Sequence, residues 1–246
     1  MPFYQRHIDK IIRCKNVVLG STIVCLQLGV LFAHAQQSDP YLAKIRSTHK
    51  TIDNAKIESV SQVFRDGNLK QAISSDTSRM WIAGDQSKVV TQNLEMVVND
   101  KYLITVNHNL KLIQYQTIPN AEKDKEPQLL QNIDSLFDNL TKPTFADNLN
   151  GLLHYRLVRP NQLYEVMDIY FDENTYLLKR VFVEYNAEMI GKKISSSVDY
   201  LVFDLHADFA PGYFGENQYM QKSNSGWSPS EEYENYSIKE SKVYVQ

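Results

Sequence analysis

Short strand-like segments separated by tight turns occupy most of the chain from residue 57 onward and constrain its fold most strongly. Residues 57–64 alternate with a period of two, and Asp66-Gly67 follows them as a hairpin turn. Further strands are predicted at residues 80–82, 89–98, 102–106, 110–117, 152–158, 163–171, 177–185 and 198–205. Strands of this length, punctuated by Gly, Asn and Asp, predict an antiparallel meander.

Two helical segments accompany the predicted sheet. Asp39 and Pro40 begin the first, as a capping residue followed by a first-turn proline, and this helix is expected to end near Asn54. Residues 129–140 form the second, with one apolar stripe made of Leu129, Leu130, Ile133, Leu136, Phe137 and Leu140. The last forty residues are rich in aromatic side chains and are expected to be loop-like. The predicted fold class is therefore α+β.

The first 35 residues have the order of a secretory signal peptide. Four basic residues precede a mostly apolar stretch at residues 17–32, and Ala33-His34-Ala35 supplies small residues before a cleavage site. Cleavage is predicted before Gln36, and an uncleaved N-terminal anchor is the alternative. The two cysteines, Cys14 and Cys25, lie within this segment. A mature chain without disulfides suits a bacterial envelope.

Charge and motifs argue against several classes of function. The chain has 26 Lys+Arg against 29 Asp+Glu, with no basic block, so no nucleic-acid partner is expected. The four histidines after residue 35 are His49, His108, His154 and His206, and no two have metal-ligand spacing. Catalytic motifs are also missing, so we expect no enzyme, no metal and no cofactor.

The strand at residues 163–171 is apolar on both sides. One side carries Leu163, Met167, Ile169 and Phe171, and the other carries Tyr164, Val166 and Tyr170. A sheet packed on one face alone should alternate more cleanly. The sheet is therefore expected to curve strongly around helices, or to meet a ligand, a partner or the C-terminal tail on its second face.

The order of signal, helix, meander, helix and hairpin strands resembles the periplasmic lipoprotein-carrier superfamily, the LolA/LolB/RseB-like fold, in its divergent Bacteroidota relatives. Local resemblance is found at residues 39–42, at residues 99–102, and in the paired late strands 164–171 and 177–183. The resemblance implies a strongly curved antiparallel sheet, an incomplete barrel with helices on its concave side. Carriers of this family bind lipoprotein acyl chains on that apolar face.

These observations together predict a signal peptide at 1–35, a LolA-like domain at 36–205 and an aromatic-rich extension at 206–246 that packs on the domain. The expected function is that of an exported, non-catalytic periplasmic binding protein for an apolar ligand or a lipoprotein acyl chain. Its partners would be a lipid, an acylated protein or another envelope protein, and association with the outer membrane is left open. The alternative is a structural or interaction subunit of an envelope or secretion assembly. Strand parity places the ligand contacts at Met80, Ile82, Met96, Val98, Leu103, Met167, Ile169 and Phe171.

Export is tested by the intact mass of the protein recovered from the periplasm of a bacterial host. We expect a chain that begins at Gln36, because Ala33 and Ala35 meet the small-residue requirement of signal peptidase. Ala35→Leu is the control and should retain residues 1–35. A wild-type mass that includes those residues, or a lipid attached to Cys25, would contradict the prediction.

Overall fold

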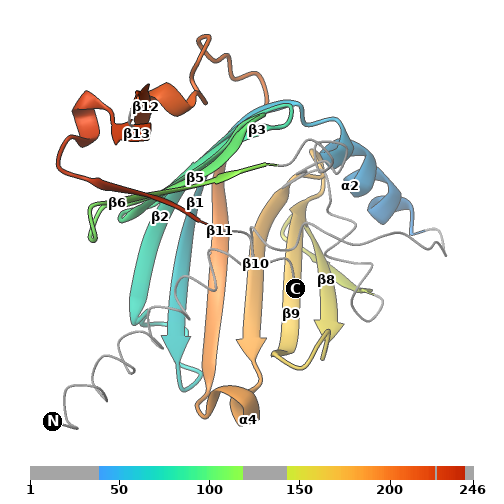
Figure 1. Cartoon of the computed structure of the whole chain (residues 1–246). Coiled ribbons are helices and arrows are strands. Elements are labelled where there is room, and N and C mark those ends of the chain that lie inside the picture. Colours follow the sequence, from blue (N-terminus) through green and yellow to red (C-terminus); the bar gives the residue numbers. More distant parts are fainter. Residues whose placement is uncertain (1–38, 119–142, 225, 242–246) are drawn as a thin grey trace, which may run out of the picture. The chain divides into compact units, whose positions relative to one another are not determined.

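The computed structural model describes residues 39–118, 143–224 and 226–241 (Figure 1). The predicted signal peptide and the predicted helix at 129–140 lie outside the described residues. The elements are α2 (Pro40–Lys50), β1 (Asn54–Arg65), β2 (Ser74–Ala83), β3 (Gln86–Val90), β4 (Leu94–Val98), β5 (Tyr102–Asn107), β6 (Leu112–Thr117), β7 (Thr144–Leu149), β8 (Leu152–Val158), β9 (Tyr164–Asp172), β10 (Leu178–Tyr185), α4 (Ala187–Ile190), β11 (Ile194–Asp204), η2 (Glu216–Gln218), β12 (Met220–Ser223), β13 (Gly226–Pro229), η3 (Glu231–Tyr233) and β14 (Ser237–Glu240).

Twelve strands form one sheet in the order β14-β6-β5-β4-β3-β2-β1-β11-β10-β9-β8-β7, and β12 and β13 form a separate hairpin. The order has two ends, so within the described residues the sheet is open rather than closed into a barrel. Neighbouring strands pair antiparallel from β2 to β6 and from β7 to β11, and β14 runs parallel to β6. The predicted fold class, a large curved antiparallel sheet with few helices, is confirmed.

Residue contacts divide the chain into two compact units. Among the described residues, unit 1 comprises 39–51, 60–75 and 143–200, and unit 2 comprises 52–59, 76–118, 201–224 and 226–241. Each unit draws on separated stretches of sequence, and the boundary predicted at residue 205 falls inside unit 2. Within the described residues, no helix is long and apolar enough to cross a membrane.

Helix α2 of unit 1 begins where the sequence predicts. The Asp39 side chain accepts hydrogen bonds from the backbone N–H groups of Tyr41 (2.9 Å) and Leu42 (3.3 Å), and Pro40 occupies the first turn. The Tyr155 hydroxyl of β8 also donates to the second Asp39 oxygen at 2.7 Å. One carboxylate thus caps the helix and attaches it to the sheet. The helix ends at Lys50, a turn earlier than expected.

Asx-Gly pairs make tight turns at two places in unit 1. Asp66-Gly67 turns the chain directly after β1 with φ angles of 56° and 74°, as predicted, although β2 begins only at Ser74. Asn150-Gly151 adopts φ angles of 53° and 81° between β7 and β8. Positive φ at both central positions is what a two-residue hairpin requires. The Asn-Gly pair was therefore a sequence signal for strand β7, which the sequence interpretation omitted.

The segment at residues 89–98 is two strands rather than the single strand predicted. Thr91 reverses the chain between β3 and β4: its N–H donates to the Leu94 carbonyl at 2.8 Å, and the Leu94 N–H donates to Thr91 Oγ1 at 3.2 Å. Threonine has high strand propensity, yet its hydroxyl also stabilises turns of this kind. The turn chemistry prevails here over the propensity.

The expectation of a loop-like C-terminus was wrong in part. The hairpin β12–β13 and strand β14 are each made of four-residue strands, and β14 extends the sheet with Ser237 opposite Leu112. Strands this short show too few alternations to be recognised by their period. Pairing with β6, which is distant in sequence, is what makes β14 a strand.

His49 of α2 is a buried histidine in the core of unit 1. Its side chain is 1% exposed, and its ring meets the edge of Phe171 at 6.1 Å between centroids. Within the described part of the chain, neither ring nitrogen has a hydrogen-bond partner of normal geometry. Burial lowers the pKa of His49 to about 4, and the nearby Tyr176 backbone offsets this only in part.

This lowered pKa makes the stability of the protein pH-dependent. The unfolded chain takes up a proton at His49 below pH 6.5, whereas the folded chain does so only near pH 4. Above pH 6.5, His49 is neutral in both states and the free energy of unfolding has its full value. As the pH falls toward 4, proton uptake by the unfolded chain lowers the free energy of unfolding by up to about 3 kcal/mol. Urea unfolding of His49→Leu should show a shallower loss over this range than wild type. His206→Gln, at an exposed position, is the control, and a His49→Leu profile parallel to wild type would contradict the prediction.

Candidate functional site

Five of the eight predicted contact residues lie on one face of the meander in unit 2. Met80 is paired with Val89 across β2–β3, and Val89 is paired with Met96 across β3–β4. The neighbouring row consists of Ile82, Ser87, Val98 and Leu103. Directly paired residues of antiparallel strands project from the same face. We call the surface made by Met80, Ile82, Val89, Met96, Val98 and Leu103 the apolar face.

Val89 belongs to this surface because of the Thr91 turn. In a single strand, Val89 and Met96 would be seven residues apart and would face opposite sides. With the chain reversed between β3 and β4, the two side chains are direct neighbours. Strand parity could have found Val89 only if the turn had been recognised first.

The apolar face is incompletely covered in comparison with a packed core. Ile82 and Val89 are buried, whereas Met80, Met96, Val98 and Leu103 are half-buried. Hydroxyl groups accompany them: Thr105 continues the row of Met96, and Ser59 and Ser78 form a hydrogen bond of 2.7 Å to each other. This hydrogen bond gives each hydroxyl group a partner and so lowers the cost of placing the pair beside an apolar surface.

The other three predicted contacts, Met167, Ile169 and Phe171, lie in unit 1 and are fully buried. They are paired across β8–β9 with Leu157, Tyr155 and Leu153, in that order. Phe171 also contacts the ring of His49 in α2. These three residues form the packed core of unit 1, so a ligand would reach them only if the core opened.

The reverse face of the unit 2 meander is covered by the C-terminal segment, residues 206–241. Val97, Ile104, Val106 and Ile113 are each 0% exposed and cluster with Phe214, Tyr219, Met220 and Tyr233. Trp227 adds edge contacts to Tyr102 and Tyr115 at 5.7 and 6.1 Å between centroids. The aromatic residues of this segment therefore pack on the sheet of their own unit.

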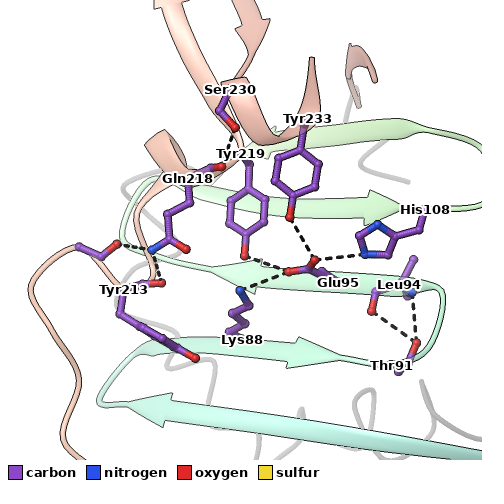
Figure 2. Close-up of polar contacts among 11 residues, drawn as sticks. Lys88, Thr91, Leu94, Glu95, His108, Tyr213, Gln218, Tyr219, Ser230 and Tyr233 are labelled. Atoms are coloured by element: carbon purple, nitrogen blue, oxygen red, sulfur yellow. Dashed lines mark hydrogen bonds and ion pairs between the residues drawn. The ribbon is translucent and has the colours of Figure 1, made fainter. Parts of the chain in front are cut away.

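A buried carboxylate, Glu95 of β4, holds the C-terminal segment in place (Figure 2). Tyr219 donates a hydrogen bond to Glu95 Oε2 at 3.2 Å, and Tyr233 donates to Oε1 at 3.1 Å. From the sheet side, Lys88 Nζ lies 3.2 Å from Oε2 and His108 Nε2 lies 3.1 Å from Oε1. All four partners converge on one carboxylate, which leaves no oxygen of the buried group unsatisfied.

The surroundings of Glu95 keep both tyrosines in the donor state. Burial, followed by the Glu95 charge, raises the pKa of Tyr219 and of Tyr233 far above the ordinary value. Lys88 Nζ lies 5.3 Å from the ring centroid of Tyr219 and 5.7 Å from that of Tyr213. The ammonium group thus binds the segment through aromatic rings as well as through the carboxylate.

His108 continues this network toward β14. Its Nε2 lies beside the Glu95 carboxylate, and its Nδ1 is hydrogen-bonded to the Tyr236 hydroxyl at 3.0 Å. The sequence analysis gave His108 no ligand role and did not select Glu95. The available signal was that Glu95 lies on the same face of its strand as Val97. An acidic side chain that is buried beside an apolar one needs partners.

A second polar cluster lies on β7–β9 of unit 1 around His154. Its two ring nitrogens lie 3.1 Å from Asp147 and 2.9 Å from Asp168, and its ring stacks on Tyr170 at 4.5 Å. Arg156 also pairs with Asp168 at 2.9 Å. The described residues contain no group of three His, Cys, Asp or Glu side chains able to hold a metal ion. The cluster links neighbouring strands.

Glu165 and Asp168 do not form a paired-carboxylate site. Glu165 is paired with Arg159 at 3.0 Å, whereas Asp168 contacts His154 and Arg156. The two carboxylates are three residues apart in one strand and therefore face opposite sides, as their parity predicts.

Similarity to known proteins is found among solved structures. No protein-family model matches the chain, and no curated protein matches it. Among solved structures, an uncharacterized conserved protein from Thermus thermophilus is 7% identical over 84% of this chain and all of its own, with a TM-score of 0.49. LolA superfamily protein NE2245 from Nitrosomonas europaea is 10% identical over 74% of this chain and 99% of its own, with a TM-score of 0.36.

The MucA/MucB complex of Pseudomonas aeruginosa also contains a similar chain, 10% identical over 71% of this chain and 59% of that one, with a TM-score of 0.42. LolA superfamily members are thus among the structures that resemble this protein, as the sequence resemblance predicts. Similarities this low bring no ligand or partner to this chain.

Removing the Glu95 carboxylate should destabilise unit 2. Glu95→Ala leaves the ammonium of Lys88 mostly buried without its partner and removes two tyrosine hydrogen bonds, so we expect a loss of about 3–5 kcal/mol. Urea unfolding followed by Trp227 fluorescence in a Trp81→Phe background measures it. Glu58→Ala, which breaks the more exposed pair with Lys56, is the control and should cost less than about 1 kcal/mol. Equal effects of the two substitutions would contradict the assignment.

Proposed function

We propose that this protein is an exported, non-catalytic binding protein that holds an apolar ligand on the apolar face of unit 2. The observation that carries the proposal is the pair of cross-strand rows in which Met80, Met96, Val98 and Leu103 remain half-buried. Apolar side chains that are arranged side by side and incompletely covered mark a binding surface for apolar groups.

An acyl chain is the ligand class that suits this surface best. The four strands β2–β5 place successive side chains about 5 Å apart, so each row is about 14 Å long, comparable to a stretch of extended hydrocarbon. Two of the six residues are methionines, whose flexible, polarizable side chains adapt to irregular apolar partners. We therefore propose a lipid or the acyl chain of a lipoprotein as the ligand and the periplasm as the place of action.

The buried groups of the two units support this choice of surface. The C-terminal segment occupies the reverse face of the unit 2 meander, and the core of unit 1 is filled by Met167, Ile169 and Phe171. The predicted contact residues that remain are those of the apolar face. A ligand can contact them without unpacking a core.

The alternative function is that of a structural or interaction subunit of an envelope assembly. The edge strand β7 favours it, because all six of its residues are exposed and Phe145 and Leu149 are large and apolar. An exposed edge strand is a template for pairing with an extended segment of another protein. This function predicts a protein partner and no bound lipid.

Titration of an environment-sensitive fatty-acid probe into the mature protein tests the proposal. Wild type should bind the probe, and Leu103→Glu should weaken binding at least about tenfold, because a carboxylate on the apolar face must be desolvated when an acyl chain is bound. Leu110→Glu is the matched control: it is the same substitution at an exposed position of unit 2, and it should bind as wild type does.

Circular dichroism and the unfolding midpoint should be the same for the two variants, which separates lost binding from lost folding. Wild-type protein that neither binds the probe nor carries lipid after purification from the periplasm would refute the proposal. Co-purification of a stoichiometric protein partner in that case would support the alternative.

A further inference from the structure

Three loops gather at one end of unit 1 and are joined by hydrogen bonds. The Asp66 N–H in the β1–β2 loop donates to the Lys193 carbonyl at 3.0 Å, which attaches this loop to the turn after α4. Asn186, before α4, donates from its backbone to the Leu163 carbonyl at 2.9 Å and from its side chain to the Gln162 carbonyl at 3.2 Å. Figure 1 shows the β1–β2 loop and α4 at the same end of the strands. We call residues 65–73, 158–163 and 186–193 the loop rim.

The loop rim exposes large apolar side chains. Leu69 is 54% exposed, Ile73 is 51% exposed and Met189 is 62% exposed, and Val158 and Leu163 are also exposed. These five account for nearly half of the eleven exposed large hydrophobic residues of the described chain. Single exposed apolar residues are ordinary, but a group of them on linked loops marks an interaction surface.

Basic side chains lie on the same loops as these apolar residues. Arg65, Lys70 and Lys193 are exposed and Lys192 is half-buried, whereas the acidic residues of the same loops, apart from the Arg159–Glu165 pair, are Asp66 and Glu188. The whole chain carries a net charge of −3. The loop rim is therefore locally positive in a protein that is acidic overall, which gives it charge complementarity to an anionic surface.

The β1–β2 loop is fixed by its own hydrogen bonds. The Asn68 N–H donates to the Arg65 carbonyl at 3.0 Å, the Lys70 N–H donates to Asn68 Oδ1 at 3.2 Å, and the Ile73 N–H donates to the Val63 carbonyl at 2.8 Å. Leu69 and Ile73 are thus presented in a defined conformation, so little ordering entropy is lost when they are buried by a partner.

We propose that the loop rim docks on the surface of an anionic lipid bilayer. Leu69, Ile73 and Met189 enter the boundary between head groups and acyl chains, and the lysine and arginine side chains of the same loops bind the lipid phosphates. Exposed apolar side chains together with basic ones are the combination that interfacial membrane binding uses. The loop rim belongs to unit 1 and the apolar face to unit 2, so this docking and the binding of an acyl ligand can fail independently.

Co-sedimentation of the mature protein with vesicles tests the proposal. One set of vesicles contains phosphatidylcholine with phosphatidylglycerol, and the other contains phosphatidylcholine alone. Wild type should bind the anionic vesicles more tightly, and the double variant Leu69→Gln/Ile73→Gln should bind them at least about tenfold more weakly, since two apolar insertions are lost. Lys70→Glu/Lys193→Glu should remove the preference for anionic vesicles and its salt dependence.

Leu110→Gln and Lys222→Glu, at exposed positions of unit 2, are the matched controls and should bind vesicles as wild type does. Leu103→Glu should also bind vesicles normally, which distinguishes docking from ligand binding on the apolar face. Failure of wild type to bind anionic vesicles would overturn the proposal, as would normal binding by Leu69→Gln/Ile73→Gln. Concentration-dependent dimers that this double variant abolishes, without vesicle binding by wild type, would instead assign the loop rim to a second copy of the chain.

Discussion

A wide antiparallel sheet with apolar residues on both faces needs other segments to cover those faces. The rest of this structure follows from that requirement. In unit 1, α2 covers the face that carries Phe171, and Asp39 attaches the helix to the sheet through Tyr155. In unit 2, the C-terminal segment covers the face of β4–β6, where four aliphatic side chains are completely buried. Hydrophobic burial supplies the driving force for both arrangements. What remains incompletely covered, the apolar face of β2–β5, is where we place the ligand.

Burial of apolar area alone does not select one position for a covering segment, because hydrophobic contact is non-directional. Glu95 supplies direction in unit 2. Its carboxylate must find donors once it is buried, and Tyr219 and Tyr233 provide them only when the C-terminal segment lies in one register. Lys88 and His108 complete the site from the sheet side. A polar site within an apolar cluster thus specifies the docking geometry, while the surrounding aromatic residues supply the buried area.

The two proposed surfaces have different chemistry because they meet different environments. The apolar face consists of aliphatic side chains and methionines with a few hydroxyl groups, which suits a hydrocarbon chain removed from water. The loop rim combines exposed apolar side chains with lysines and arginines, which suits the interface between lipid and water. A protein that held an acyl chain and also touched a bilayer would need both kinds of surface.

Local chemistry determined much of the secondary structure from the sequence alone. The period-two segments predicted most strands of the sheet, the Asp39-Pro40 cap predicted where α2 begins, and Asp66-Gly67 predicted a hairpin, because each depends on neighbouring residues only. Five of the eight predicted contacts share one face for the same reason, since parity is a local property. The tertiary structure alone decided what covers each face. The Thr91 turn brought Val89 beside Met96, β14 became a strand by pairing with β6, and Glu95 acquired partners more than a hundred residues away. Met167, Ile169 and Phe171 became core rather than an open surface for the same reason. Burial is a property of contacts between distant segments, and no local pattern specifies which segments will meet.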